Sequence, residues 1–166
     1  MTEGTARTSL PMAQGFELAG PVPARGVTMP VSIIRNHPVA SDEVNALRVA
    51  AWDEVGEQDW EPILRRSLGW VCALDGDRLV GFVNVAWDGG AHAFLLDTTV
   101  HRDVQRQGIG TSLVLEAAAM AQNRGAEWLH VDFEDDLGPF YVACGFGPAS
   151  AGLIDLTDTL RVPDAG

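Results

Sequence analysis

Apolar residues recur with helical spacing in three parts of the chain. The first pattern joins Val44, Leu47, Ala51 and Val55, and Ser41 or Asp42 before it can cap a helix. A second helical piece is expected from about Trp60 to Ser67. The strongest pattern runs from Ile109 to Arg124 and stops at Gly125, which is typical of a C-terminal cap. A short helix should open at Gly138-Pro139 and stop at Gly145, because proline suits the first helical position.

Strands are predicted where short apolar runs lie between turn residues. Asp75-Gly76-Asp77 is a turn sequence favoured for hairpins. The predicted order is one strand, two helices, three strands, then helix, strand, helix and strand, which indicates a mixed α/β sheet with an antiparallel first part. The expected strands cover residues 31–35, 70–74, 78–87, 91–100, 128–133 and 152–156.

Residues 1–29 lack a regular apolar period and are rich in Gly, Pro, Ala and Thr. We interpret them as an irregular N-terminal extension, followed by one domain over residues 30–166.

The composition of the chain then excludes several classes of partner and location. The net charge of −12 argues against nucleic acid and anionic membranes as partners and is compatible with a cationic small molecule. No run of about twenty apolar residues predicts a membrane span, and no secretory signal is recognisable. Cys72 and Cys144 are expected to be reduced core thiols, so we expect a cytoplasmic protein.

The most informative segment lies between a predicted strand and the predicted Ile109 helix. A helix N-terminus presents unpaired N–H groups and partial positive charge, so it binds phosphate readily, and glycines let the backbone approach an anion. The segment lacks the lysine of a nucleoside-triphosphate P-loop, and Leu113 stands where a Rossmann fingerprint needs a small residue. Its residues are Gln105, Arg106, Gln107, Gly108, Ile109, Gly110 and Thr111.

Two motifs resemble the GNAT acetyltransferases. Gln105 to Gly110 is similar to that family's Gln/Arg-x-x-Gly-x-Gly/Ala signature, and Phe140 to Phe146 is similar to its Phe-Tyr-x-x-x-Gly-Phe segment. The resemblance covers about residues 30–156. It implies an α/β GNAT fold, with a mixed, mostly antiparallel sheet of about six to seven strands and about four helices.

The resemblance also implies roles for individual residues. The backbone of Gln105 to Thr111 would hold the pyrophosphate of acetyl-CoA, which is a co-substrate, and Val100 would bond the pantetheine arm and offer its N–H to the thioester carbonyl. Tyr141 would protonate the departing thiolate, unless it is a core tyrosine. Attack is direct in this family, so no cysteine nucleophile is needed. Homodimers are common among its members, so a homodimer is one expectation.

The sequence departs from the family in two places. Many members carry Asn at the position of Asp135, where it contacts the pantetheine arm, so that contact is expected to differ. Members with a Glu or His base often hold it on the fourth strand, in register with Phe94 or Leu96, which cannot accept protons. Asp97 is the nearest acid and is a candidate base acting through water; a cap or turn ligand is the alternative.

The acceptor is expected to be a small cationic amine. Carboxylates cluster at Asp132, Glu134, Asp135 and Asp136, although a solvated loop and helix cap is the default explanation for them. Trp52 and Trp60 fall near the junction of the first two helices, which often lines the acceptor site in this family; core packing is the alternative.

Two other functions remain open. A non-catalytic acyl-CoA-binding module could share the fold. Alternatively, His130, Asp132 and Glu134 alternate on one predicted strand and could bind a metal, but no further ligand has a recognisable spacing, so we expect none.

Overall fold

The computed structural model describes residues 30–52, 56–154 and 156. In this part of the chain five strands form one sheet in the order β1-β2-β3-β4-β5, with β1 to β4 antiparallel and β5 parallel to β4. The elements are β1 (Ser32–Arg35), α1 (Ser41–Ala51), α2 (Glu61–Leu64), β2 (Gly69–Asp75), β3 (Arg78–Trp87), β4 (His92–Val100), η1 (Arg102–Val104), α3 (Ile109–Asn123), β5 (Trp128–Val131), η2 (Asp135–Leu137) and α4 (Gly138–Ala143).

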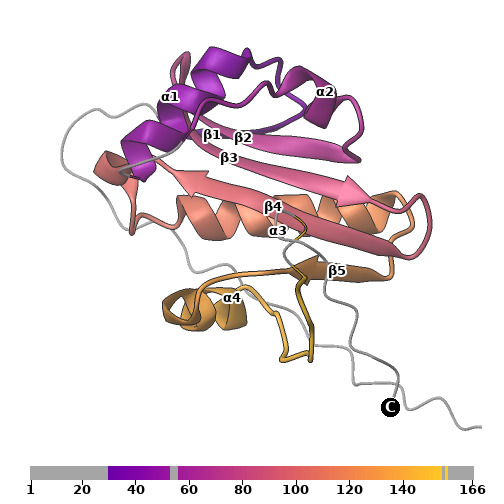
Figure 1. The fold of residues 1–166 in the computed structure, drawn as a ribbon. Helices are drawn as coiled ribbons and strands as arrows, with labels where there is room; N and C mark the ends of the chain where they lie inside the picture. Colours follow the sequence, from indigo (N-terminus) through magenta and orange to yellow (C-terminus); the bar gives the residue numbers. More distant parts are fainter. Residues whose placement is uncertain (1–29, 53–55, 155, 157–166) are drawn as a thin grey trace, which may run out of the picture.

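The sheet separates two apolar cores, and Figure 1 shows helices on both of its faces. α1 and α2 cover one face, where Val44, Leu47 and Trp60 pack on Phe82. α3 covers the other face, where Leu113 and its neighbours pack on the valines of β2 and β3. The central strands are therefore apolar on both faces, as their long apolar runs predict. Burial on both faces fixes the register of β3, the strand beside the candidate site.

Most predicted element boundaries are confirmed, but the start of the first helix differs. The hairpin turn falls at Gly76 and Asp77, and α3 begins at Ile109. α1, however, is capped by Ala40, whose N–H donates to the Glu43 carboxylate at 2.8 Å. Ser41 lies inside the helix, and its hydroxyl accepts the Trp60 N–H at 2.9 Å. Val55, expected on the same helix face, lies outside the described residues.

A β-bulge interrupts β4. Leu96 pairs with Asn84 and Thr99 with Phe82, so two residues of β4 stand opposite one residue of β3. The first of the two, Asp97, has a φ of 56°, and its carbonyl accepts the Thr99 hydroxyl at 3.0 Å. Pairing of β4 with β5 ends at Leu95, before the bulge. Beyond it, the outer backbone edge of β4 is not paired with β5.

The expected sheet of six to seven strands is wrong for the described part of the chain, which forms five. The last predicted strand, 152–156, is absent: residues 152–154 and 156 pair with no strand, and Leu153 is 82% exposed. An apolar run becomes a strand only when its backbone finds a partner. Among the described residues, no helix has both the length and the apolar character needed to cross a membrane.

Candidate active site

The loop before α3 is shaped by two residues with positive φ. Arg106 has a φ of 62° and Gly108 one of 82°, a region that favours glycine. Gly108 caps α3, and its carbonyl accepts the Ser112 N–H at 3.0 Å, the first bond of the helix. The N–H groups of the first turn therefore have no partner within the helix. A Cβ at Gly108 would meet nothing within 4 Å, so this turn opens onto free space where an anion can approach.

The two sequence motifs meet at Gly110. A Cβ there would lie 3.3 Å from the Phe140 ring and 3.7 Å from Val100, so a larger residue would push Phe140 away by a few tenths of an ångström. The Cys144 thiol also shares a hydrogen bond with Thr111, which fixes α4 on the first turn of α3. The end of β4, the start of α3 and α4 are thereby brought together, as the two motifs predicted.

The backbone of Val100 points away from β3. The His101 N–H donates to the Val80 carbonyl at 2.9 Å, so alternation turns the N–H and carbonyl of Val100 toward the outer edge of β4. The carbonyl there accepts Gln105 Nε2 at 3.0 Å. Since β5 does not pair with this part of β4, the Val100 N–H can serve as a donor to a ligand.

Tyr141 combines a buried ring with an accessible hydroxyl. The residue is 5% exposed, and its ring stacks on Phe133 at 4.7 Å and meets the edges of Phe140 and Phe146. In the described part of the chain, the one buried side-chain oxygen or nitrogen without a partner is Asn84 Oδ1, and no hydrogen bond to the Tyr141 hydroxyl is present. The hydroxyl is thus neither bonded into the core nor sealed from solvent.

Asp97 lies within β4, at the bulge, rather than at the strand end. Its carboxylate faces Asn84 of β3, which hydrogen-bonds to it, and Arg48 of α1. The residue is solvent exposed, yet partial burial of the carboxyl group raises its pKa above the ordinary value; Arg48 and then the Asn84 bond oppose that rise. A carboxylate whose pKa is raised is a better proton acceptor than an ordinary surface Asp.

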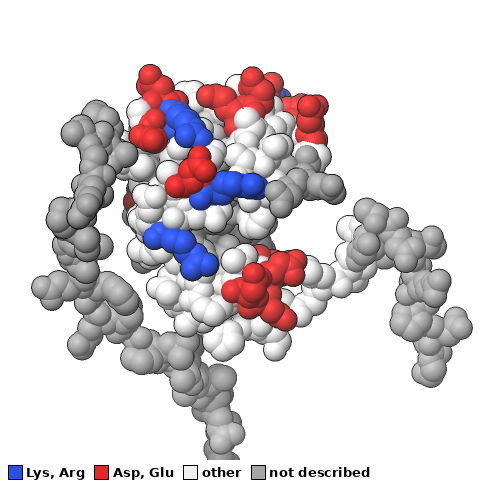
Figure 2. All heavy atoms as spheres, turned by 90° about the vertical axis from the view of Figure 1, so that its left-hand side faces the viewer, with Lys and Arg blue, Asp and Glu red and all other residues white. Residues whose placement is uncertain are grey.

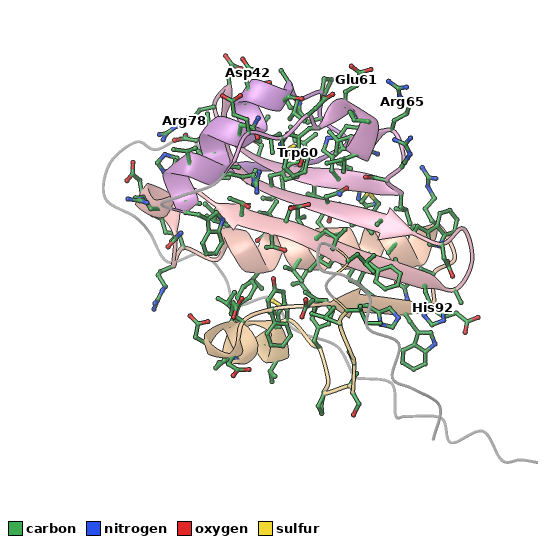
Figure 3. All side chains as sticks on the ribbon, in the orientation of Figure 1. Asp42, Trp60, Glu61, Arg65, Arg78 and His92 are labelled. Atoms are coloured by element: carbon green, nitrogen blue, oxygen red, sulfur yellow. The ribbon has the colours of Figure 1, made fainter. Side chains whose placement is uncertain are left out.

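The two tryptophans have different surroundings. Trp52 follows α1 and is 47% exposed. Trp60 is only 2% exposed and lies between the helices and the sheet in Figure 3, so the structure places it in the core instead of an acceptor site. Its Nε1 donates to Asn45 at 3.1 Å, and the Arg48 guanidinium lies over its ring at 5.5 Å. Trp60 therefore supports Arg48, which in turn faces Asp97.

The four predicted carboxylates form one exposed group between β5 and α4. Figure 2 shows acidic side chains gathered low on this side of the molecule, with arginines between them and the acidic residues near α1. The group consists of Asp132, Glu134, Asp135 and Asp136, of which Asp135 opens η2. Gln107 and Arg106 on the α3 loop are also exposed.

No three His, Cys, Asp or Glu side chains converge as a metal site within residues 30–52, 56–154 and 156. His130 instead contacts His92 at 2.8 Å between ring nitrogens and stacks on Phe94. Asp132 and Glu134 do not join it in such a group.

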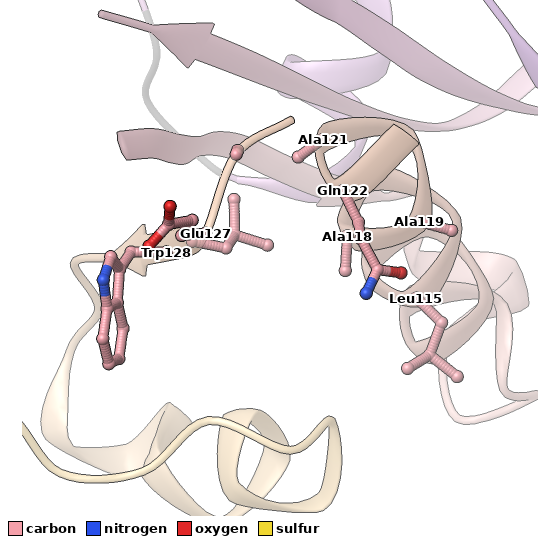
Figure 4. Close-up of a pocket in the computed structure, with 9 residues that line it drawn as sticks. Leu115, Ala118, Ala119, Ala121, Gln122, Glu127 and Trp128 are labelled. Carbon is pink, nitrogen blue, oxygen red and sulfur yellow. The ribbon is translucent and has the colours of Figure 1, made fainter. Parts of the chain in front are cut away.

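The cysteines are unsuited to act as nucleophiles. Burial raises the pKa of the Cys72 thiol to about 12, and it also raises that of Cys144. A hollow of about 390 Å³ lies elsewhere, between α3 and the start of β5 (Figure 4). Leu115, Gln122 and Trp128 line it, and it contains none of the predicted site residues.

Comparisons with known proteins decide the family. Residues 36–146 match the acetyltransferase (GNAT) family. The chain belongs to this family. A GNAT family acetyltransferase from Streptococcus pneumoniae is 30% identical, with a TM-score of 0.66, over 76% of this chain and 97% of that one. A comparison with curated protein sequences gives no significant match.

More distant members share the fold. A Trypanosoma brucei acetyltransferase is 16% identical with a TM-score of 0.62, over 76% of this chain and 99% of that one. Glucosamine-6-phosphate N-acetyltransferase from Arabidopsis thaliana is 11% identical with a TM-score of 0.58, over 76% and 99%. Acetyl-CoA is typical of the GNAT family, and the open first turn of α3 suits its pyrophosphate.

Two residues near Asp97 in this GNAT domain were not predicted from the sequence. Asn84 is the one amide in the otherwise apolar interior of β3, a signal that was available but was not used. Arg48 carries no comparable signal, because one arginine on an amphipathic helix is ordinary.

Proposed function

We propose that the protein is an N-acetyltransferase that moves the acetyl group of acetyl-CoA to a primary amine by direct attack in a ternary complex. The observation that carries the proposal is the position of the β4 bulge. On one side of it Val100 meets the first turn of α3 and Phe140, beside Tyr141. Three residues earlier on the same strand, Asp97 faces α1. A base and an acid thus flank the strand that would present the thioester.

The chemistry assigns one task to each group. Asp97, through a water molecule, takes the proton that the amine must lose before or during attack. The amine nitrogen bonds to the thioester carbon, and the Val100 N–H donates to the oxygen on which negative charge develops. The C–S bond then breaks, and the Tyr141 hydroxyl protonates the departing thiolate. Elevated thiol pKa values at Cys72 and Cys144 support direct attack over an acyl-cysteine route.

The proposed acceptor is a small cationic amine. The net charge of −12 and the exposed carboxylates between β5 and α4 support a cation. The half-exposed Trp52 at the end of α1 offers a ring face that a protonated amine can contact.

The test measures thiol release from acetyl-CoA against a panel of amines, with Asp97→Asn as the variant. We expect the variant to lose about 10²-fold in kcat/KM, because the amide cannot accept a proton. Asp77→Asn, in the exposed β2–β3 turn, is the matched control and should retain full activity. If the wild type binds acetyl-CoA but acetylates no amine, the chain is a binding module instead of an enzyme.

The pH dependence has a definite sign. Activity should fall as the pH drops through the pKa of Asp97, and at a higher pH than an ordinary Asp would give. The folded state holds this proton more tightly than the unfolded chain, so the contribution of Asp97 to stability falls as the pH rises through the same range. Asp97→Asn should therefore not lower Tm at neutral pH. A lower Tm would show that its loss of activity is partly a loss of folding.

A further inference from the structure

Asn84 occupies a position that costs folding stability. It is 1% exposed in the middle of β3, between Val83 and Val85, which are fully buried. Its Oδ1 has no hydrogen-bond partner and is the one such buried side-chain atom in the part of the chain that the structure describes. An unpaired buried oxygen loses its hydration without compensation, whereas leucine, of similar size, would have no polar atom to bury. The amide is therefore not explained by packing.

The other end of the same amide has a partner. Asn84 pairs with Leu96 across the sheet, immediately before the bulge, so its side chain lies near the Asp97 carboxylate, on which it acts as a donor. Asn84 lies on the face that α1 covers, because it is two residues after Phe82, which belongs to that core. The charged group facing Asp97 from α1 is Arg48. Asp97 thus has a neutral donor near it on the sheet and a positive charge near it on α1.

A purely structural asparagine would use both ends of its amide. Here the carbonyl end is unpaired, and the donor end is committed to a carboxylate whose backbone is already fixed by the bulge. The side chain has two χ angles, and full burial allows it little movement. It can therefore determine the direction in which a lone pair of Asp97 remains available to a proton.

We propose that Asn84 is a positioning residue that orients the Asp97 carboxylate for proton acceptance from the acceptor amine, at a direct cost in folding stability. The proposal rests on the proposed function, in which Asp97 is the base. The donor also favours the charged form of Asp97, so its removal raises the pKa of that group further.

The test compares Asn84→Leu with Phe82→Leu. Phe82 lies on the same face of β3, is fully buried and packs on Trp60, but it is not bonded to Asp97. The carboxyl carbon of Asp97 is titrated by NMR in the ligand-free protein, Tm is measured at pH 7, and kcat/KM is measured against pH with acetyl-CoA and an amine from the panel.

For Asn84→Leu we expect an unchanged or higher Tm and a rise in the pKa of Asp97 of about half a unit or more. The acidic limb of kcat/KM should move up by the same amount, and kcat should fall about tenfold. Phe82→Leu should give the opposite result: Tm should fall, while the Asp97 titration and the acidic limb of kcat/KM should not move. Should Asn84→Leu fold poorly, Asn84→Ala should show the same titration shift.

The outcomes are separable. If the Asp97 titration is unchanged in both Asn84 variants, the proposal is overturned. It is also overturned if the titration shifts but kcat and the acidic limb of kcat/KM do not change. A wild type that releases no thiol with any amine counts against the proposed function, and hence against a base held by Asn84. A shifted titration would still establish the bond in that case.

Discussion

The two sides of β4 are built in different ways. On the α3 side, the proposed anion-binding turn and the proposed oxyanion donor are backbone N–H groups; Gly108 shapes the turn, and the pairing of β4 with β3 turns the Val100 N–H outward. On the α1 side, the working groups are side chains drawn from three separate elements, namely Asp97, Asn84 and Arg48. The first side needs only a short continuous segment of sequence, whereas the second needs long-range pairing to assemble.

This difference teaches how the site divides its tasks. A site made of backbone N–H groups can bind any ligand that carries the same pyrophosphate and thioester, and most side-chain substitutions leave it intact. A side-chain site can be altered one residue at a time, so we expect this side to set the acceptor. The following predictions test that division, from the largest expected effect to the smallest.

The strongest test is Gly108→Glu, which should weaken acetyl-CoA binding by about 100-fold or more in calorimetry. A φ of 82° strains glutamate, and its carboxylate repels the phosphates. Gly108→Asn is the matched control, because Asn tolerates positive φ and adds no charge, and it should cost only about threefold. Equal loss in both variants would assign the effect to strain alone.

Tyr141→Phe should lower kcat by about 10²-fold and leave the acetyl-CoA Kd nearly unchanged, since only the proton donor is lost. Phe133→Leu removes the ring stacked on Tyr141 and keeps the hydroxyl, so its kcat should stay within a few-fold of wild type. Full turnover by Tyr141→Phe would make the residue a packing residue and leave the α3 side without its acid.

A smaller effect is expected from the exposed carboxylates. Asp132→Asn or Glu134→Gln should each raise the acceptor KM about threefold at low salt, and added salt should raise the wild-type KM, because screening weakens surface attraction. Glu127→Gln, an exposed carboxylate at the start of β5, should have no effect. If the acceptor KM changes neither with salt nor with these substitutions, the carboxylates belong to a solvated loop.

The smallest effect is expected from deletion of residues 1–29, which lie outside the described part of the chain. Their composition predicts little contribution to the core, so Tm and the acetyl-CoA Kd should stay close to those of the full chain. A truncated chain that does not fold, or that changes its oligomeric state, would overturn the division of the chain at residue 30.

The α3 side was largely predictable because its signals are local. The glycine pattern predicted the loop conformation, and the apolar period predicted that α3 begins at Ile109. Contact between the two motifs followed from the family resemblance and is realised at Gly110 and Phe140.

The α1 side was only partly predictable, because its geometry depends on pairing between distant segments. A bulge leaves no mark in the residue pattern of β4, so neither the irregularity at Asp97 nor its proximity to Asn84 was predicted. For Trp60 the burial supports core packing, one of its two readings, because an amphipathic pattern does not show which aromatic residue the sheet covers. The predicted last strand failed for the same reason, since 152–154 have strand-like composition but no backbone partner.

The bulge shifts the alternation of side chains along β4 by one residue. In a regular strand, Phe94, Leu96 and residue 100 would point to the same face of the sheet. Because of the extra residue, Thr99 lies on the face of Leu96 instead, and Val100 points toward α3. Deleting Thr98 would reverse every side chain and every amide up to the α3 loop. The chain would keep every other residue named above and still lose the donor and the contact with Gly110. At this point the length of β4, rather than its composition, carries the information for catalysis.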